Sequence, residues 1–376
     1  MARIWVMDAE MLGYKNLIPV ADEMRRRGHS VMIFGAEVFA DQIKNDIEVG
    51  KRRTFVDFVD IEGRDNPERI FEHFEHPDLI LTGIALRPGT GLNIVAGTNK
   101  DTPKVALLGG YAGKLFKSKD DGQLLFSPNI FLVNDPSAAK IVGSEFPHLA
   151  KTGKILVIGN PHYDELSRAD RVGTRKEARE KLGIKDHLPV VFYAGSSASR
   201  EGHEIISEGE ALKMAVNVVN RLMAVNDFHF IARHHPRLDK EGKEIQKTGW
   251  LDALKKLEKH AVDSSHMKTE EVLAASDLVI AIPGGIVSEA AVFHKQVVSL
   301  ATPEVMRRYR LEWGTSEFPT AELGCCAEAR SQNELEEMIK LGLNGKLDLL
   351  ENQERHFKTD GKNTQRVCDF LETLLN

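Results

Sequence analysis

Cysteine, long apolar runs and excess positive charge are all scarce in this chain of 376 residues. Its three cysteines, Cys325, Cys326 and Cys368, form no CxxC pair and have no zinc-type spacing to histidine. This argues against a disulfide framework and favours a reducing compartment. No apolar run is long enough to span a bilayer, and the first residues do not resemble a signal peptide, so we expect a cytoplasmic protein. The net charge of −6 gives no reason to expect nucleic acid as a partner.

Several catalytic motifs are also missing. The chain has no GxxxxGK[ST], no HExxH and no GxSxG, and no GxGxxG follows the first expected strand. Their absence makes a P-loop kinase, a zinc metalloprotease, a serine hydrolase and a dinucleotide-binding enzyme poor candidates. We therefore expect no metal site and no cofactor.

Short apolar runs alternate with helix-like segments through the first half of the chain. After the first run, a loop through Gly13 leads into a helix whose apolar residues share one face. Continuous apolar strands that alternate with helices are typical of a parallel sheet covered on both faces. The expected strands cover residues 3–7, 30–34, 54–59, 79–82, 104–108 and 130–133.

The same alternation starts again near residue 189. The expected elements are strands at residues 189–194, 228–232 and 261–263, a strand from residue 278, and helices that include 251–260 and 270–275. The fold class is therefore α/β, with two doubly wound parallel-sheet domains whose ligands bind at the carboxyl ends of strands. We place an N-terminal acceptor domain at 1–165, a C-terminal nucleotide-donor domain at 166–360, and an amphipathic helix at 361–376 that can pack back on the first domain.

Residues 278–300 carry the strongest functional signal. An apolar strand runs into Pro283, Gly284 and Gly285, and a helix follows with Ser288 and Glu289 in or near its first turn. Such a turn lets backbone N–H groups approach an anion at the positive end of a helix. A carboxylate at Glu289 can accept hydrogen bonds from a ribose diol. The segment predicts a nucleoside diphosphate site; the alternative is a glycine turn that only packs the helix on the strand.

Two other strand ends in this half carry residues suited to phosphate. The strand that begins at residue 189 is followed by Gly195, Ser196 and Ser197. Small residues there permit close approach of a phosphate, and the hydroxyls can donate to it. Arg233 and His235 follow the next strand, where a cation can stabilise charge on a leaving diphosphate. His234 should face the other way on an extended chain. A plain loop and a surface histidine are the alternatives.

Four passages together resemble the GT-B superfamily of nucleotide-sugar enzymes. In chain order they are RGHSV from residue 27, IGNP from residue 158 with Asp164, HP from residue 235, and SDLV from residue 276 with the later Gly284, Gly285 and Glu289. The second resembles the hinge of sugar-nucleotide 2-epimerases and related transferases. The third is similar to a passage of epimerases and of glycerophosphate and sialic acid transferases, and the fourth is similar to a donor motif.

The resemblance implies two Rossmann-like domains that face a cleft, with the donor nucleotide held mainly by the second. It also implies a metal-independent glycosyltransferase that moves a sugar from a donor such as a UDP-sugar to an unidentified acceptor. In this interpretation Gly284 and Gly285 hold the diphosphate and Glu289 holds the ribose. Arg233 stabilises the leaving charge, and His235 contacts phosphate or transfers a proton. The hinge passage fixes the domain connection.

The acceptor side is expected at the end of the first strand, where Asp8 and Glu10 lie. A carboxylate there can remove the proton of an acceptor hydroxyl, so Asp8 is the candidate general base. Thr82 and Gly83 end a later strand and are expected to shape the acceptor side. An acid that only caps a helix is the alternative for Asp8.

Other reactions and partners stay open at this stage. A nucleotide-sugar 2-epimerase and a CDP-glycerol-type phosphotransferase would use the same scaffold. A non-catalytic nucleotide-sugar binder is a third hypothesis, because the first loop lacks the Gly-Gly-His of many transferases. A cell-envelope glycan or lipid is one option for the acceptor. Basic clusters at 25–27 and 51–53, mainly solvated faces, leave room for peripheral membrane contact, and a homodimer is also open.

Overall fold

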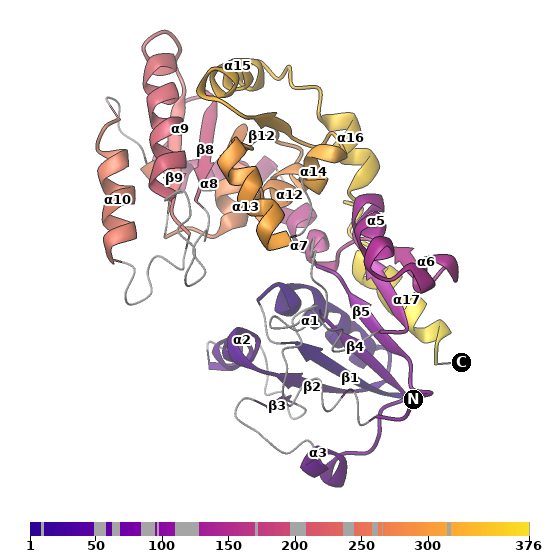
Figure 1. Ribbon diagram of the computed structural model, residues 1–376. Coiled ribbons are helices and arrows are strands. Elements are labelled where there is room, and N and C mark those ends of the chain that lie inside the picture. The colour runs from indigo at the N-terminus through magenta and orange to yellow at the C-terminus, as the bar shows by residue number, and fades with distance from the viewer. Residues whose placement is uncertain are drawn as a thin grey trace. The chain divides into compact units, whose positions relative to one another are not determined.

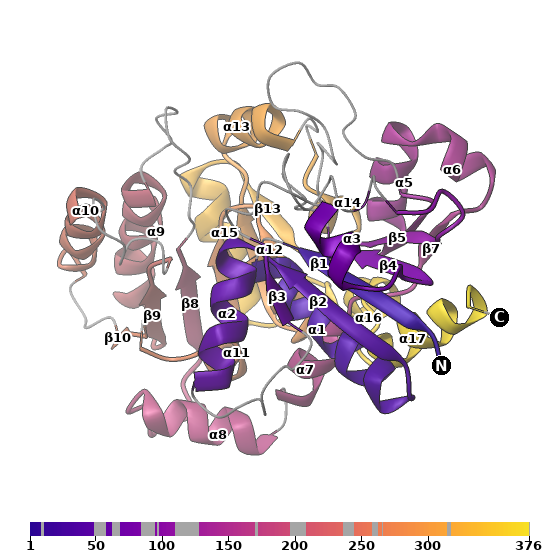
Figure 2. The ribbon, with the colours of Figure 1, turned by 90° about the horizontal axis from the view of Figure 1, so that it is seen from below.

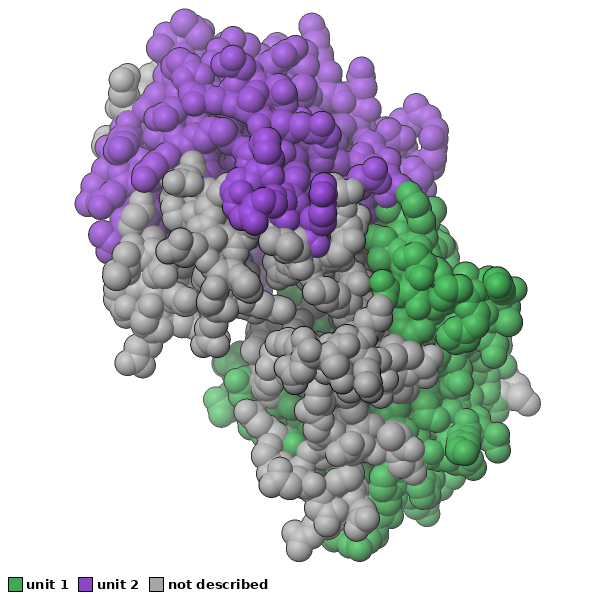
Figure 3. Space-filling model, in the orientation of Figure 1, with its two compact units in different colours: residues 1–165, 358–376 green, residues 166–357 purple. Residues whose placement is uncertain are grey.

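The protein is described from a computed structural model that divides into two compact units. Unit 1 contains residues 1–165 and 358–376, and unit 2 contains residues 166–357 (Figure 3). The structure describes residues 1–8, 11–48, 58–61, 68–83, 95, 98–109, 128–169, 172–195, 208–235, 244–257, 262–264, 266–313 and 317–375. Within these ranges, no helix is both long enough and apolar enough to cross a membrane.

Unit 1 is built on a seven-stranded sheet in which every neighbouring pair is parallel. The strand order is β3-β2-β1-β4-β5-β6-β7, and strands β1 to β5 are labelled in Figure 1. The strands are β1 (Arg3–Asp8), β2 (Ser30–Gly35), β3 (Phe58–Asp60), β4 (Leu79–Thr82), β5 (Lys104–Leu107), β6 (Ile130–Val133) and β7 (Ile155–Val157). The outward order of the strands on both sides of β1 and β4 is that of a doubly wound sheet.

Helices cover both faces of this sheet. They are α1 (Met11–Arg26), α2 (Glu37–Glu48), α3 (Glu68–His73), α5 (Pro136–Glu145), α6 (Pro147–Lys151) and α17 (Asn363–Thr373). Alternate strand residues such as Ile4 and Leu81 pack with Leu17 of α1 and Leu371 of α17 in one buried cluster. Full burial of such an aliphatic side chain contributes about 1.5–3 kcal/mol, so α17 is part of the core of unit 1. On the other face Trp5 lies 5.8 Å from the ring of Phe71 in α3.

Unit 2 has a six-stranded sheet, also parallel throughout. In sheet order its strands are β10 (Val262–Asp263), β9 (His229–Arg233), β8 (Val190–Ala194), β11 (Leu278–Ala281), β12 (Gln296–Leu300) and β13 (Ala327–Ala329). Its helices are α8 (Val172–Lys181), α9 (Glu208–Met223), α10 (Glu244–Leu254), α11 (Thr269–Ala275), α12 (Gly285–Val292), α13 (Pro303–Trp313), α14 (Pro319–Glu322), α15 (Gln332–Leu343) and α16 (Leu350–His356). The helix α7 (Pro161–Ala169) contains the boundary between the units.

The helices of unit 2 also lie on both faces of its sheet (Figure 2). Residues of α9, α10 and α15, among them Leu212, Trp250 and Leu335, share a buried cluster with one face of the strands. On the other face α11 packs on β8, and α12 packs on β11 and β12. The predicted fold class, two parallel-sheet α/β domains, is therefore confirmed.

Some predicted element bounds were wrong. The helix expected at 251–260 is α10, which begins at Glu244 and ends at Leu254, because the buried Trp250 and Ala253 anchor it to the core. The strand expected at 54–59 is described only from Phe58 and runs to Asp60. Gly13, expected in a loop, lies in the first turn of α1, which begins at Met11.

The passage that begins at Arg27 holds α17 on unit 1. The guanidinium of Arg27 donates to Glu23 at 2.9 Å and to Glu372 at 2.8 Å, and it forms an ion pair with Asp369 at 2.7 Å. The ring of His29 contacts Glu372 at 3.2 Å. These carboxylates raise the pKa of Arg27 although burial opposes the charge. The RGHSV passage, the first of the four that resemble the GT-B superfamily, therefore has a structural role.

The second passage, IGNP with Asp164, contacts the start of α17. One carboxylate oxygen of Asp164 accepts from the backbone N–H and side-chain amide of Asn363, at 2.9 and 2.8 Å, and the other accepts from Thr364 N–H at 2.8 Å. Gly159 has φ +99°, and a Cβ there would lie 2.0 Å from Asn363 Oδ1. This passage thus caps α17 where the chain has returned to unit 1.

Candidate functional site

Three neighbouring strands of unit 2 end at the same edge of the sheet. Ala194 of β8 pairs with Arg233 of β9 on one side and with Ala281 of β11 on the other. Strands in a sheet lie about 4.8 Å apart, so these three strand ends span about 10 Å. Gly195 directly follows β8, and Gly284 lies three residues after Ala281. The predicted phosphate-binding segments are therefore brought to one edge.

Packing against the described residues does not explain the glycine pair at this edge. Gly284 caps α12 with φ 171°, an extended conformation open to any residue. A Cβ on Gly285 would meet none of the described atoms within 4 Å, and one on Gly284 would meet only the Ile282 carbonyl oxygen, at 3.7 Å. The first N–H groups of a helix have no acceptor within the helix. The missing side chains thus leave space beside groups that can bind an anion.

Ser288 does not face this space. Its side chain is buried, and its hydroxyl forms a hydrogen bond of 2.8 Å with the hydroxyl of Thr320 in α14. Ser288 therefore fixes α12 against α14 instead of offering its hydroxyl to a ligand. Glu289, one residue further along α12, is partly exposed.

Arg233 and His235 lie at the end of β9. The Arg233 guanidinium donates to the Thr269 hydroxyl at 2.7 Å, which holds it against the start of α11. Arg233 and His235 are both partly exposed, whereas His234 between them is buried with its ring 6.3 Å from that of Trp250. The alternation predicted for these residues is therefore confirmed, and His234 belongs to the core.

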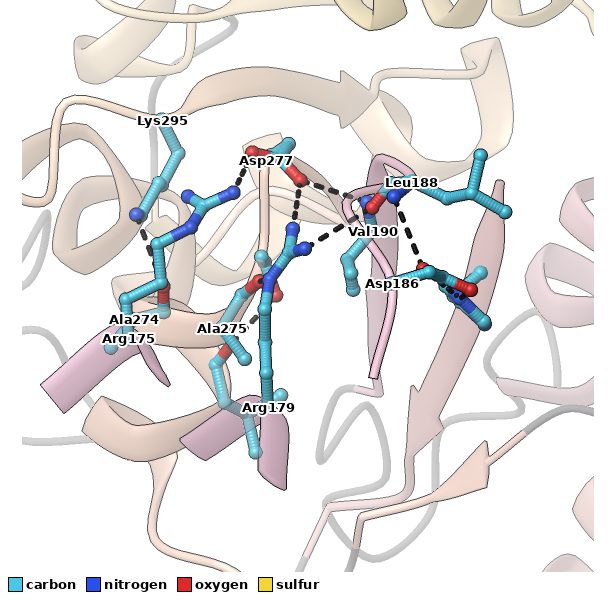
Figure 4. A network of polar contacts seen from close by, with 12 residues as sticks. Arg175, Arg179, Asp186, Leu188, Val190, Ala274, Ala275, Asp277 and Lys295 are labelled. Atoms are coloured by element: carbon cyan, nitrogen blue, oxygen red, sulfur yellow. Dashed lines mark hydrogen bonds and ion pairs between the residues drawn. The ribbon is translucent and has the colours of Figure 1, made fainter. Parts of the chain in front are cut away.

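Asp277 of the SDLV passage has a structural role, apart from the glycine pair that follows it. Asp277 lies just before β11, at the sheet edge opposite the glycine pair, and binds the guanidinium groups of Arg175 and Arg179 (Figure 4). The Arg179 contact is 2.7 Å, and Asp277 also accepts from the Val190 N–H at 2.8 Å. Burial lowers the pKa of Arg179. Asp277 thus ties α8 to the amino ends of β8 and β11.

Asp8 lies at the carboxyl end of β1 in unit 1 and is only 2% exposed. A Cβ on Gly13 would lie 1.9 Å from Asp8 Oδ2, and a Cβ on Gly83 would lie 1.4 Å from it. Among the described residues, the carboxylate is therefore packed against Gly13 of α1 and against Gly83 at the end of β4, and a side chain at either position would overlap it. The sequence identified Asp8 and Gly83 separately but gave no signal that they touch.

The remaining predicted residues have varied outcomes. Ser196 and Ser197 lie outside the described residues, as does Glu10. Among the described residues, no three His, Cys, Asp or Glu side chains gather as a metal site would require. Cys325, Cys326 and Cys368 are buried and unpaired with one another, and burial raises the pKa of Cys368 to about 12.

Solved structures with a similar fold include a 2-epimerase, a glycosyltransferase and a wall teichoic acid polymerase. The UDP-GlcNAc 2-epimerase from Methanocaldococcus jannaschii has a TM-score of 0.67 at 14% identity, covering 99% of each chain. A glycosyltransferase from Rickettsia africae has a TM-score of 0.61 at 12% identity, covering 100% of this chain and 99% of its own. The wall teichoic acid polymerase TagF, as a variant soaked with CDPG, has a TM-score of 0.59 at 14% identity, covering 100% of this chain and 89% of its own.

The two parallel-sheet units and these likenesses show the GT-B-type fold that the sequence resemblance predicted. The family can be stated more closely. The chain belongs to the CDP-Glycerol:Poly(glycerophosphate) glycerophosphotransferase family, whose model matches residues 117–373. No curated protein matches the sequence.

Proposed function

We propose that the protein transfers a glycerophosphate group from a cytidine diphosphate-activated donor to an acceptor hydroxyl. The observation that carries this proposal is the edge of unit 2, where Gly195, Arg233 and the pair Gly284–Gly285 lie at or just after the ends of three adjacent strands, and where a Cβ on Gly285 would meet none of the described atoms within 4 Å. The family description and the likeness to TagF soaked with CDPG support a cytidine donor.

In the donor site, the amides that open α12 bind the diphosphate. Glu289 accepts hydrogen bonds from the ribose hydroxyls, and Arg233 with His235 stabilises the charge that develops on the leaving phosphate. Thr269 holds the Arg233 guanidinium at 2.7 Å, which preorganises the cation. A charge fixed in advance costs no reorganisation when the bond breaks.

The transfer is a displacement at phosphorus. The acceptor oxygen bonds to the phosphorus that carries glycerol, the bond from that phosphorus to the bridging oxygen breaks, and CMP leaves. The hydroxyl proton passes to the Asp8 carboxylate, which we propose as the general base. The acceptor binds to unit 1 and the donor to unit 2 in this scheme.

Sugar transfer from a nucleotide sugar is the second candidate, because the fold is shared with a glycosyltransferase and with 2-epimerases. The products separate the reactions. Glycerophosphate transfer releases CMP, sugar transfer releases a nucleoside diphosphate, and epimerisation turns over the donor without an acceptor. A non-catalytic binder would give ligand binding and no product at all. Membrane contact, a homodimer and independence from metal remain predictions.

The first experiment is a thermal-shift panel of CDP, UDP, GDP, dTDP and CMP. A ligand that binds only the folded state raises the melting temperature by mass action, so the preferred base is visible without knowledge of the acceptor. We expect the largest shift with CDP. The donor with that base is then incubated with acceptors, and the released nucleotide is analysed. A preference for UDP with release of UDP would replace glycerophosphate transfer by sugar transfer.

A further inference from the structure

Asn134 has an unusual position for a buried amide. It directly follows β6 and is only 2% exposed. Neither its Nδ2 nor its Oδ1 has a hydrogen-bond partner among the described residues. Buried polar groups are nearly always paired, because leaving them unpaired costs free energy. Such an amide therefore has binding capacity that the fold itself does not use.

A second asparagine at the same edge shows the contrast. Val133 pairs with Val157, so Asn134 lies level with the segment that follows β7. In that segment Asn160 is also buried, but its Nδ2 donates to the Gly109 carbonyl at 3.1 Å and its Oδ1 accepts from His162 N–H at 2.9 Å. Asn160 is thus satisfied by the protein. Asn134, at the carboxyl edge where ligands of open α/β sheets bind, is not.

The chemistry around Asn134 favours a neutral hydroxyl as the ligand. An amide offers donors and an acceptor together, and a hydroxyl group can satisfy one of each. The next residue, Asp135, is fully buried, and its carboxylate accepts from the Ala138 N–H at 3.0 Å as the cap of α5. Phosphate oxygens only accept hydrogen bonds, so a phosphate would leave the acceptor oxygen of the amide unused. The site therefore suits the polyol part of a substrate.

We propose that Asn134 binds a hydroxyl of the acceptor that is distinct from the one that reacts. This inference rests on the proposed function, in which Asp8 takes the reacting proton. The strands β1 and β6 are separated by β4 and β5, and three strand spacings place their ends about 14 Å apart. One hydroxyl cannot contact both side chains. A poly(glycerophosphate) acceptor, as named in the family description, is long enough to reach both, and Asn134 recognises a unit away from its reacting end.

The test compares Asn134→Leu with Asn160→Leu as the matched control. The acceptors are glycerol 3-phosphate, as the short probe, and a poly(glycerophosphate) oligomer, as the long probe, with CDP-glycerol as donor. Leucine has nearly the shape of asparagine and leaves no unpaired polar group, so Asn134→Leu should preserve the melting temperature, whereas Asn160→Leu should lower it. For Asn134→Leu, the KM ratio of long to short acceptor should rise about tenfold, the loss of one hydrogen bond.

Calorimetric binding of the oligomer gives the inference a readout independent of turnover. Weaker binding to Asn134→Leu than to the wild type supports it. Equal binding, or a fall in melting temperature like that of Asn160→Leu with an unchanged KM ratio, overturns it and makes Asn134 a structural residue that holds buried water. If the wild type binds the oligomer through Asn134 but never transfers glycerophosphate, the proposed function fails and the subsite stands.

Discussion

Each unit keeps a pair of glycines at the carboxyl edge of its sheet, but for opposite reasons. In unit 1, side chains on Gly13 and Gly83 would overlap the carboxylate of Asp8, at 1.9 and 1.4 Å. In unit 2, a side chain on Gly285 would meet none of the described atoms within 4 Å. The unit 1 pair is explained by a group of the protein itself. For the unit 2 pair we propose a group that the protein binds.

This difference distinguishes glycines that packing requires from glycines that we propose ligand binding requires. A residue that packing requires should affect stability when it is replaced, because cores have few voids. A residue that keeps space for a ligand should affect binding and leave the free protein stable. The two glycine pairs can therefore be tested by the same substitution with opposite expected results.

The largest effect is expected for Asp8, which lies between the two glycines of unit 1. Asp8→Asn nearly keeps the shape of the side chain but cannot accept the acceptor's proton, so kcat should fall by about 10²–10⁴. CDP affinity, measured by calorimetry, should remain that of the wild type because the proposed nucleotide site lies in unit 2. An unchanged kcat would remove Asp8 as the base and leave it a structural acid.

The next effect is on stability. Gly83→Ala places a methyl group against Asp8 and should destabilise the protein by about 1–3 kcal/mol, the usual cost of overpacking, measured by urea unfolding. The double variant Asp8→Ala with Gly83→Ala removes the overlap and should recover part of this loss. If Gly83→Ala is as stable as the wild type, Asp8 does not pack as closely against Gly83 as described.

The unit 2 counterpart is Gly285→Ala, with Glu289→Ala beside it. Both should weaken CDP binding by about tenfold, the scale of one lost hydrogen bond or charge contact, and Gly285→Ala should leave the melting temperature of the free protein nearly unchanged. Ser288→Ala is the contrasting control, since it breaks the buried bond to Thr320 and should lower stability first. Gly285→Ala with full CDP affinity would break the comparison between the units.

The smallest effect concerns acid stability of unit 1. The contacts of Glu23 with Arg26 and Arg27 lower its pKa to about 2, against opposing burial. A lowered pKa means that the unfolded chain binds the proton more readily, so this stabilisation is present above the unfolded pKa and lost as pH falls from about 4.5 to about 2. Glu23→Gln should remove about 1 kcal/mol of pH-dependent stability in this window. Denaturation curves at each pH that coincide with those of the wild type would contradict it.

Sequence patterns predicted those features that depend on local periodicity. The expected strands at 79–82 and 130–133 are β4 and β6. Parallel strands have their carboxyl ends at one edge of the sheet. The prediction that Gly195, Arg233 and Gly284 lie at one edge therefore required only that each lies at or after the end of a strand of the same parallel sheet. The alternation that excluded His234 was equally local.

Contacts between distant parts of the chain could not be predicted. The direction of Ser288 depends on Thr320 in another helix. The structural function of Asp277 depends on two arginines of α8 that precede it by about a hundred residues. The packing around Asp8 depends on Gly83, which follows β4, a strand that is next to β1 only in the folded sheet. Asn134 is notable only because its side chain has no hydrogen-bond partner among the described residues.

The most direct measurement is a crystal structure of the protein with bound CDP. The account predicts that diphosphate oxygens lie within about 3 Å of the backbone nitrogens that open α12, and that Glu289 contacts the ribose. A nucleotide bound away from the carboxyl edge of β8, β9 and β11, or a side chain filling the space beside Gly284 and Gly285, would contradict it.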